Sequence, residues 1–162
     1  MELDTAVDGW PEAIDWPQLA ERSVKAAAKF EPVVANLRLT TSILFTSDEQ
    51  VQELNKEWRG KDKPTNVLSF PMLEREDLLG LEADGPPEML GDIALAYGTC
   101  QREADEKGVS LRDHTAHLLV HGFLHLAGHD HVDSDEQAAA MEKLEIEALA
   151  FLGIADPYGD RA

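Results

Sequence analysis

Three histidines stand at a spacing that suits one metal ion. His121 and His125 are four residues apart, and His131 follows after five intervening residues. Four residues along an α-helix correspond to a rotation of about 40° and a rise of about 6 Å, so the first two imidazoles can reach one ion. Gly128 can adopt the left-handed conformation that ends helices, which lets the chain turn back and present His131. Three neutral imidazoles and an open fourth position predict a catalytic site for one Zn²⁺ per chain.

Alternative roles for these histidines fit the sequence less well. A structural role on a buried helix face could explain one or two histidines. It explains less well three histidines at this spacing with a glycine between the second and the third. A structural zinc site usually has four protein ligands, often cysteines, and the chain has a single cysteine, Cys100. A metallopeptidase would share the metal geometry, but peptidases of the H-E-x-x-H type have a glutamate as general base where this chain has Gly122. Peptide hydrolysis is therefore a disfavoured alternative.

The segment from His121 to His131 resembles the signature of the YbeY family of bacterial endoribonucleases, which act in ribosomal RNA maturation. The stretches 55–59, 64–71 and 90–93 also agree with that family, and together the matching segments cover most of residues 37–152.

Two positions depart from the family pattern. Asn66 stands where the family commonly has aspartate, and His129 stands where it commonly has tyrosine. A hypothesis specific to this chain makes His129 a proton donor near the metal. An unchanged pH–rate profile after His129→Tyr would rule that role out.

The resemblance implies a zinc-dependent, single-strand-specific endoribonuclease of the cytoplasm. It would act in 3′-end processing of small-subunit rRNA and in ribosome quality control. The implied partners are a small-subunit rRNA precursor, the ribosome, a small-subunit ribosomal protein and an Era-type GTPase, with no membrane and no DNA. The family's catalytic arginine falls on Arg59, whose position at a helix end would otherwise fit a charge that caps the helix dipole.

Further side chains are candidates for supporting a ligand or lining a substrate groove: Asp92, His117, His129, Asp130, Lys56, Lys61 and Ser69. His117 shares a helix face with the metal ligands and is expected to be buried and hydrogen-bonded, whereas His114 is expected to be exposed. Asp92 either orients a ligand imidazole or bonds to a turn at a strand end. Asp130 is one candidate for the general base.

A net charge of −18 argues against a general nucleic-acid binder, because phosphate contacts need lysine and arginine. The best basic cluster is Lys56, Arg59, Lys61 and Lys63, so we expect weak intrinsic RNA affinity and delivery of the substrate by partners. The acidity also keeps open a ribosome-assembly factor with little catalysis. The acidic start of the chain, the single cysteine and the lack of a long apolar stretch fit the cytoplasm.

The length of 162 residues predicts one domain over 1–162. Hydrophobic periodicity and capping residues predict an edge strand at 1–8, strands at 36–46, 66–71 and 90–97, and helices at 17–29, 48–58, 98–107, 111–127 and 135–152. Strand 36–46 should alternate through Leu37, and helix 48–58 should bury Trp58. Residues 73–89 are expected to form a mobile acidic loop. The order of elements predicts an α+β fold with a small mixed sheet and a central buried helix carrying the metal ligands.

Overall fold

A mixed sheet forms the middle layer of the protein, which is seen here in a computed structural model that describes residues 1–129 and 134–158. The strands lie in the order β1-β2-β4-β3. Their bounds are Glu2–Val7 for β1, Leu39–Thr46 for β2, Val67–Pro71 for β3 and Glu88–Ala96 for β4. Strands β1, β2 and β4 run parallel, and β3 pairs with β4 in the antiparallel sense. Strand β1 is therefore an edge strand, as predicted for the N-terminus.

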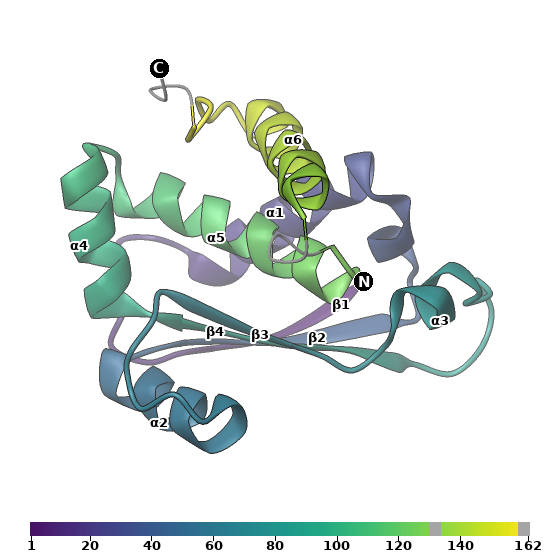
Figure 1. Cartoon of the computed structure of the whole chain (residues 1–162), viewed down its shortest axis with the longest axis horizontal. Coiled ribbons are helices and arrows are strands. Elements are labelled where there is room, and N and C mark those ends of the chain that lie inside the picture. The colour runs from purple at the N-terminus through teal and green to yellow at the C-terminus, as the bar shows by residue number, and fades with distance from the viewer. Residues whose placement is uncertain (130–133, 159–162) are drawn as a thin grey trace.

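Helices cover the two faces of the sheet unequally (Figure 1). Helices α1 (Trp16–Phe30), α5 (Leu111–Leu126) and α6 (Asp135–Phe151) lie on one side, and α2 (Asp48–Arg59) lies on the other. Helix α4 (Tyr97–Lys107), the short α3 (Arg75–Leu79) and the 3-10 helix Pro32–Ala35 occupy the ends. This architecture confirms the predicted α+β fold with helices packed on a small mixed sheet.

Serine side chains fix where the helices begin. The Oγ of Ser110 accepts a hydrogen bond from the amide of Asp113 at 3.0 Å at the start of α5. Ser47 does the same for Gln50 at the start of α2, and Ser134 for Gln137 at the start of α6. Each bond satisfies an amide that has no partner inside its helix, which contributes roughly 0.5–2 kcal/mol. The predicted helix starts are thus confirmed at the level of the capping residue.

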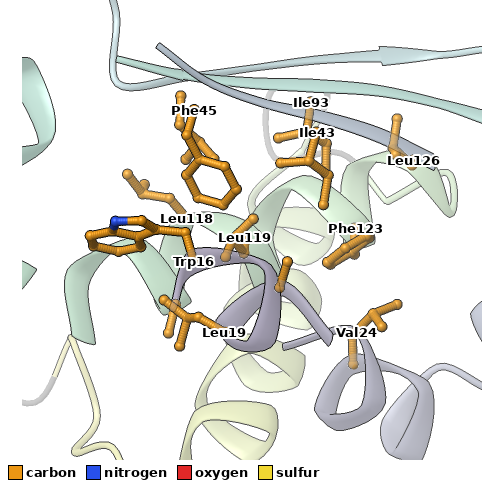
Figure 2. Close-up of a cluster of buried hydrophobic side chains, with 14 of the residues drawn as sticks. Trp16, Leu19, Val24, Ile43, Phe45, Ile93, Leu118, Leu119, Phe123 and Leu126 are labelled. Atoms are coloured by element: carbon orange, nitrogen blue, oxygen red, sulfur yellow. The ribbon is translucent and has the colours of Figure 1, made fainter. Parts of the chain in front are cut away.

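Helix α5 is the central helix, buried between the sheet and α1. Its side chains Leu118, Leu119, Phe123 and Leu126 project into the same cluster as Phe45 and Ile93 of the sheet and Trp16 and Leu19 of α1 (Figure 2). Full burial of each such side chain stabilises the fold by roughly 1.5–3 kcal/mol. The helix that carries two of the predicted ligands therefore rests on a packed core, which confirms its predicted central position.

Three sequence predictions about the strands, the helix α2 and the loop before β4 are wrong. Residues 73–89, expected to form an acidic loop, are not loop throughout, because they contain α3 with its buried Leu78 and the first two residues of β4. Leu37 is 85% exposed, because the chain forms a 3-10 helix at 32–35 and enters β2 only at Leu39. Trp58 is 67% exposed, because the C-terminal end of α2 lies over a hollow in the sheet surface instead of packed side chains.

No described helix is long and apolar enough to cross a membrane.

Candidate metal centre

Two of the predicted ligands lie side by side on α5. The ring centroids of His121 and His125 are 4.8 Å apart, and both residues are half-buried. One helical turn separates them, as their spacing predicts. The helix ends directly after them, and Gly128 has a φ of 99°, a conformation that turns the chain out of the helix. His131 and Asp130 lie outside the described residues.

A buried carboxylate stands behind this histidine pair. Glu145 of α6 is 1% exposed, and its Oε1 accepts hydrogen bonds from His121 Nδ1 at 3.0 Å and from His117 Nε2 at 2.9 Å. The hydroxyl of Tyr158 donates to the same carboxylate at 3.2 Å. A proton held on His121 Nδ1 leaves Nε2 in the unprotonated form that a metal ligand needs.

The hydrogen bonds determine the ionisation of Glu145. Burial by itself would raise the pKa of this carboxyl, but the bonds from His117 and His121 outweigh burial and lower the pKa to about 2. Glu145 is therefore an anion at neutral pH. It places a negative charge in direct contact with a predicted ligand, which favours a cation on the far side of that imidazole.

A second buried carboxylate holds the turn that follows α5. Glu31, 6% exposed at the end of α1, accepts a hydrogen bond from His129 Nε2 and forms an ion pair with Arg75 at 3.3 Å. Arg75 Nη1 also donates to the carbonyl oxygen of Ala127 at 2.7 Å. Burial would raise the pKa of Glu31, but the bonds from His129 and Arg75 lower it below its usual value. Glu31 and Arg75 thus fasten the chain immediately before the segment that contains His131.

A third polar group lies between α4, α5 and β3. His114 is 3% exposed, so the expectation of an exposed histidine is wrong, and its Nε2 contacts Glu103 at 2.8 Å. Burial lowers the pKa of His114. Glu103 also accepts from the amide of Asn66 at 3.0 Å. An aspartate at position 66 would have no proton to donate to Glu103, so the departure from the family pattern is matched by a partner in this chain.

The single cysteine lies beside this group. The Cys100 side chain is fully buried on α4, with its sulfur 3.6 Å from the carbonyl oxygen of Asn66. Burial, reinforced by the nearby Glu103 and Asp48, raises the pKa of the thiol to about 12.

The position that carries the general base in zinc peptidases packs closely against the sheet. A Cβ on Gly122 would lie 3.0 Å from Ile93 Cδ1, because α5 packs directly on β4 there. A glutamate at this position would meet the core side chains of the sheet. The structure thus adds a steric reason to the chemical one against a metallopeptidase.

The remaining candidates divide between the two faces of the sheet. Ser69 pairs with Ile93 in the β3–β4 register and therefore shares the face on which α5 lies. Asp92 precedes Ile93 and points to the opposite face, in a groove beside α2, so it is not brought to the histidines. Lys56, Arg59 and Lys61 are exposed at the end of α2 and in the loop after it. Among the residues that the structure describes, none forms a side-chain hydrogen bond or ion pair with the exposed guanidinium of Arg59.

These side chains fit a divalent metal, although the described residues supply only part of the site. Within 1–129 and 134–158, no group of three or more His, Cys, Asp or Glu side chains converges as metal ligands. The described part supplies His121 and His125, and the carboxylate on His121 Nδ1 is the partner that ligand histidines in metal sites usually have. Imidazole donors suit zinc and several other transition metals.

Sequence reasoning missed both buried carboxylates. Glu145 lies at the same helical phase as Met141 and Ala148 in the core stripe of α6, and a carboxylate in such a stripe needs a partner. That signal was visible, but the partner His121 is 24 residues away in the chain and only the fold identifies it. Glu31, between α1 and the 3-10 helix, has no comparable signal.

The fold and the site together define a class, namely α+β proteins whose central helix carries a histidine pair backed by a buried carboxylate. The chain belongs to the YbeY family, because the family described as Endoribonuclease YbeY matches residues 9–153.

Individual relatives agree over nearly the whole chain. The Endoribonuclease YbeY of Erythrobacter litoralis is 65% identical over 161 residues, which are 99% of each chain. That of Novosphingobium aromaticivorans is 57% identical and covers 98% of this chain and 93% of its own. The solution structure of TM1509 from Thermotoga maritima has a TM-score of 0.58 at 23% identity, covers 93% of this chain and 91% of its own, and shows the fold alone.

Proposed function

We propose that this protein is a zinc-dependent endoribonuclease that cleaves single-stranded RNA, with one zinc ion bound by His121, His125 and His131. Its membership of a family described as Endoribonuclease YbeY supports the reaction class, hydrolysis of RNA phosphodiester bonds. The observation that carries the metal is the contact of His121 Nδ1 with the buried Glu145. Bound zinc would supply Lewis-acid chemistry at the scissile phosphate.

The residues of the chain have separate tasks in this proposal. Glu145 keeps the proton of His121 on Nδ1 and orients the ring. Glu31 and Arg75 hold the end of α5, so that the next segment is presented in one position. In this arrangement His129 contributes a hydrogen bond to Glu31, and Asp130 stays a candidate for the general base.

Arg59 has two possible roles, catalysis or RNA binding, which kinetic measurements can distinguish. The family resemblance gives it a catalytic role, in which a guanidinium stabilises charge on the reacting phosphate. Its exposed place at the end of α2, on the far face of the sheet from α5, instead supports a contact to the RNA backbone. Loss of a transition-state contact lowers kcat, whereas loss of a uniform binding contact raises KM alone. Arg59→Ala, compared with Arg22→Ala on α1, distinguishes these outcomes.

We further propose that the substrate is the 3′ region of a small-subunit rRNA precursor and that the protein acts on the ribosome in the cytoplasm. A role in ribosome quality control and contacts with a small-subunit ribosomal protein and an Era-type GTPase belong to the same proposal. The charge of −18 supports delivery by partners, because the acidic surface repels RNA over most of the molecule.

Metal analysis of the purified protein followed by an RNA cleavage assay tests this function. We expect about one zinc per chain, cleavage of an unstructured RNA, and loss of both zinc and cleavage in His121→Ala. Processing of the precursor at the parental rate by His121→Ala would contradict the enzyme. That result would favour an assembly factor, which the acidic charge also fits.

A further inference from the structure

An open groove lies on the sheet face opposite α5, beside α2. Its volume is about 430 Å³, and its walls include Leu54 and Trp58 of α2 and Met72 just after β3. Pockets that take small molecules have volumes of about 300–1,000 Å³, so the groove has room for a planar ring. It is separate from the histidine pair, which α5 holds on the other side of the sheet (Figure 1).

One row of residues across the sheet forms the floor of this groove. In the strand register, Asp4 pairs with Ser42, Ser42 with Asp92, and Asp92 with Phe70. Paired residues share a face of the sheet, and the strands that carry Asp4 and Asp92 are about 10 Å apart. The floor thus sets hydrogen-bond acceptors beside an aromatic ring.

The rim of the groove combines an exposed indole with positive charge. Trp58 is 67% exposed, whereas Trp10 and Trp16 are buried in the core. The basic cluster Lys56, Arg59, Lys61 and Lys63 lies on the same helix and the loop that follows, and all of its members are exposed. Lys56 forms an ion pair with Asp62 at 4.0 Å, so the other three supply most of the positive charge. In a chain of net charge −18, this combination of an aromatic side chain and cations is the pattern that binds single-stranded nucleic acid.

We propose that the groove receives an unpaired base of the RNA, stacked on Trp58, while the adjoining phosphates contact the basic cluster. This inference rests on the proposed function and adds a substrate-binding subsite to it. The carboxylates of Asp4 and Asp92 repel phosphate but accept hydrogen bonds from an exocyclic amino group. A cytosine has such a group where uracil has a carbonyl oxygen, so of these two pyrimidines the subsite prefers cytosine.

The same floor disfavours an apolar protein segment. An aliphatic side chain that filled the groove would bury Asp92 and Ser42 without hydrogen-bond partners, which is unfavourable. A base with an amino group covers the same apolar walls and supplies a donor. The groove therefore fits an unpaired base better than a hydrophobic helix or a second copy of the chain.

Trp58 provides its own spectroscopic readout, because it is the exposed one of the chain's three tryptophans. The intact, metal-loaded protein is titrated at fixed ionic strength with hexamers of cytidylate and uridylate whose linkages are phosphorothioate and whose 2′-hydroxyls are methylated to resist cleavage, and gels confirm that the hexamers stay intact. We expect saturable quenching by the cytidylate hexamer, about fivefold tighter binding than for uridylate, and protection of Trp58 from acrylamide.

Substitutions at three positions separate stacking, base recognition and charge. Trp58→Ala should weaken cytidylate binding about 10-fold, within the roughly 5- to 150-fold range that stacking of one base provides, and Trp58→Phe should retain most of it. Asp92→Asn should remove the preference for cytidylate. Lys61→Ala should weaken both hexamers equally. Leu37→Ala, which truncates an exposed apolar side chain outside the groove, is the matched control and should bind like the parent.

Failure of the proposed base-binding groove can be distinguished from failure of the proposed nuclease activity. A parent protein that cleaves RNA while Trp58→Ala binds both hexamers normally would overturn the groove and leave the nuclease intact. Burial of Trp58 that depends only on protein concentration, or that a ribosomal protein causes without RNA, would overturn it in favour of a protein interface. A protein that does not cleave RNA could still show quenching that prefers cytidylate and depends on Trp58. That result would support the groove and contradict only the proposed nuclease activity.

Discussion

At Glu145, one carboxylate oxygen accepts hydrogen bonds from two imidazoles, so the affinity of His121 for the proposed zinc ion should depend on α6. We expect Glu145→Gln to weaken zinc binding by about 10–100-fold, because the neutral amide no longer raises the basicity of the ligand ring. Competition with a chromogenic chelator measures this affinity. Glu147→Gln, two residues along the same helix, is the control and should bind zinc like the parent. Equal affinities in the two variants would show that Glu145 only fills the core.

The lowered pKa of Glu145 also predicts a pH dependence of stability. Because the pKa falls from 4.5 to about 2 on folding, the unfolded chain binds a proton here more readily than the folded protein. The contribution is complete above pH 5 and is lost as the pH falls from about 4.5 toward 2. We expect the metal-free parent to lose up to about 3 kcal/mol relative to Glu145→Gln over that interval, measured by urea unfolding. A constant difference between pH 5 and pH 2.5 would contradict the assignment.

At the residue scale, sequence predicts spacing but not partners. The i, i+4 relation of His121 and His125 survives folding because it is local to one helix. Glu145 and Glu31 reach the site from α6 and α1, and no local pattern states which histidine each will meet. His114 shows the same limit, since its burial depends on Glu103 of the neighbouring helix.

Among the elements, the turn after α5 combines a left-handed glycine with close contacts to Arg75. Gly128 has a φ of 99°, and a Cβ there would lie 2.7 Å from Arg75 Cβ. Gly153 has a φ of 79° with open space around its Cβ position. We expect Gly128→Ala to cost about 1–3 kcal/mol and Gly153→Ala roughly 1 kcal/mol, since only the first adds a steric clash to backbone strain.

Urea unfolding of both metal-free glycine variants measures this difference. Only Gly128→Ala should also lower the affinity for zinc, because Arg75 and Glu31 would lose their hold on the turn. If both variants lost the same stability and kept parental zinc affinity, the turn would have no part in presenting a ligand.

The helix starts could be predicted because a serine cap bonds to an amide only three residues away, as at Ser47, Ser110 and Ser134. The exposure of Trp58 was not, because helical periodicity gives the phase of a side chain but not where the underlying surface ends. Helix α3 was missed for a related reason. Its single buried side chain, Leu78, is too short a pattern to show a period.

Over the whole molecule, the sheet separates two chemical surfaces. The histidine pair and its carboxylates lie on the side of α5 and α6, and the basic cluster lies on the side of α2 (Figure 1). The first surface is built on the hydrophobic core, so the fold does not depend on the metal for its existence.

Removal of zinc should therefore lower the melting temperature without unfolding the protein at room temperature. Zinc present at about 1,000 times its dissociation constant contributes about 4 kcal/mol, which corresponds to a shift on the order of 10 °C for a domain of this size. Thermal melts followed by circular dichroism, with and without chelator, measure the shift. Readdition of zinc should restore it, and a chelated protein already unfolded at 25 °C would contradict a metal-independent core.

The inaccessible thiol on α4 has a practical consequence. Cys100 is the chain's one sulfhydryl, and its pKa of about 12 leaves almost no thiolate at neutral pH. Maleimides and disulfide reagents should therefore not react with it while the protein is native. A cysteine substituted for Lys61 or Met72 would then be the single attachment point for a dye or a photocrosslinker. Crosslinks from a probe at such a position would map, nucleotide by nucleotide, where a bound RNA strand crosses the surface of the native protein.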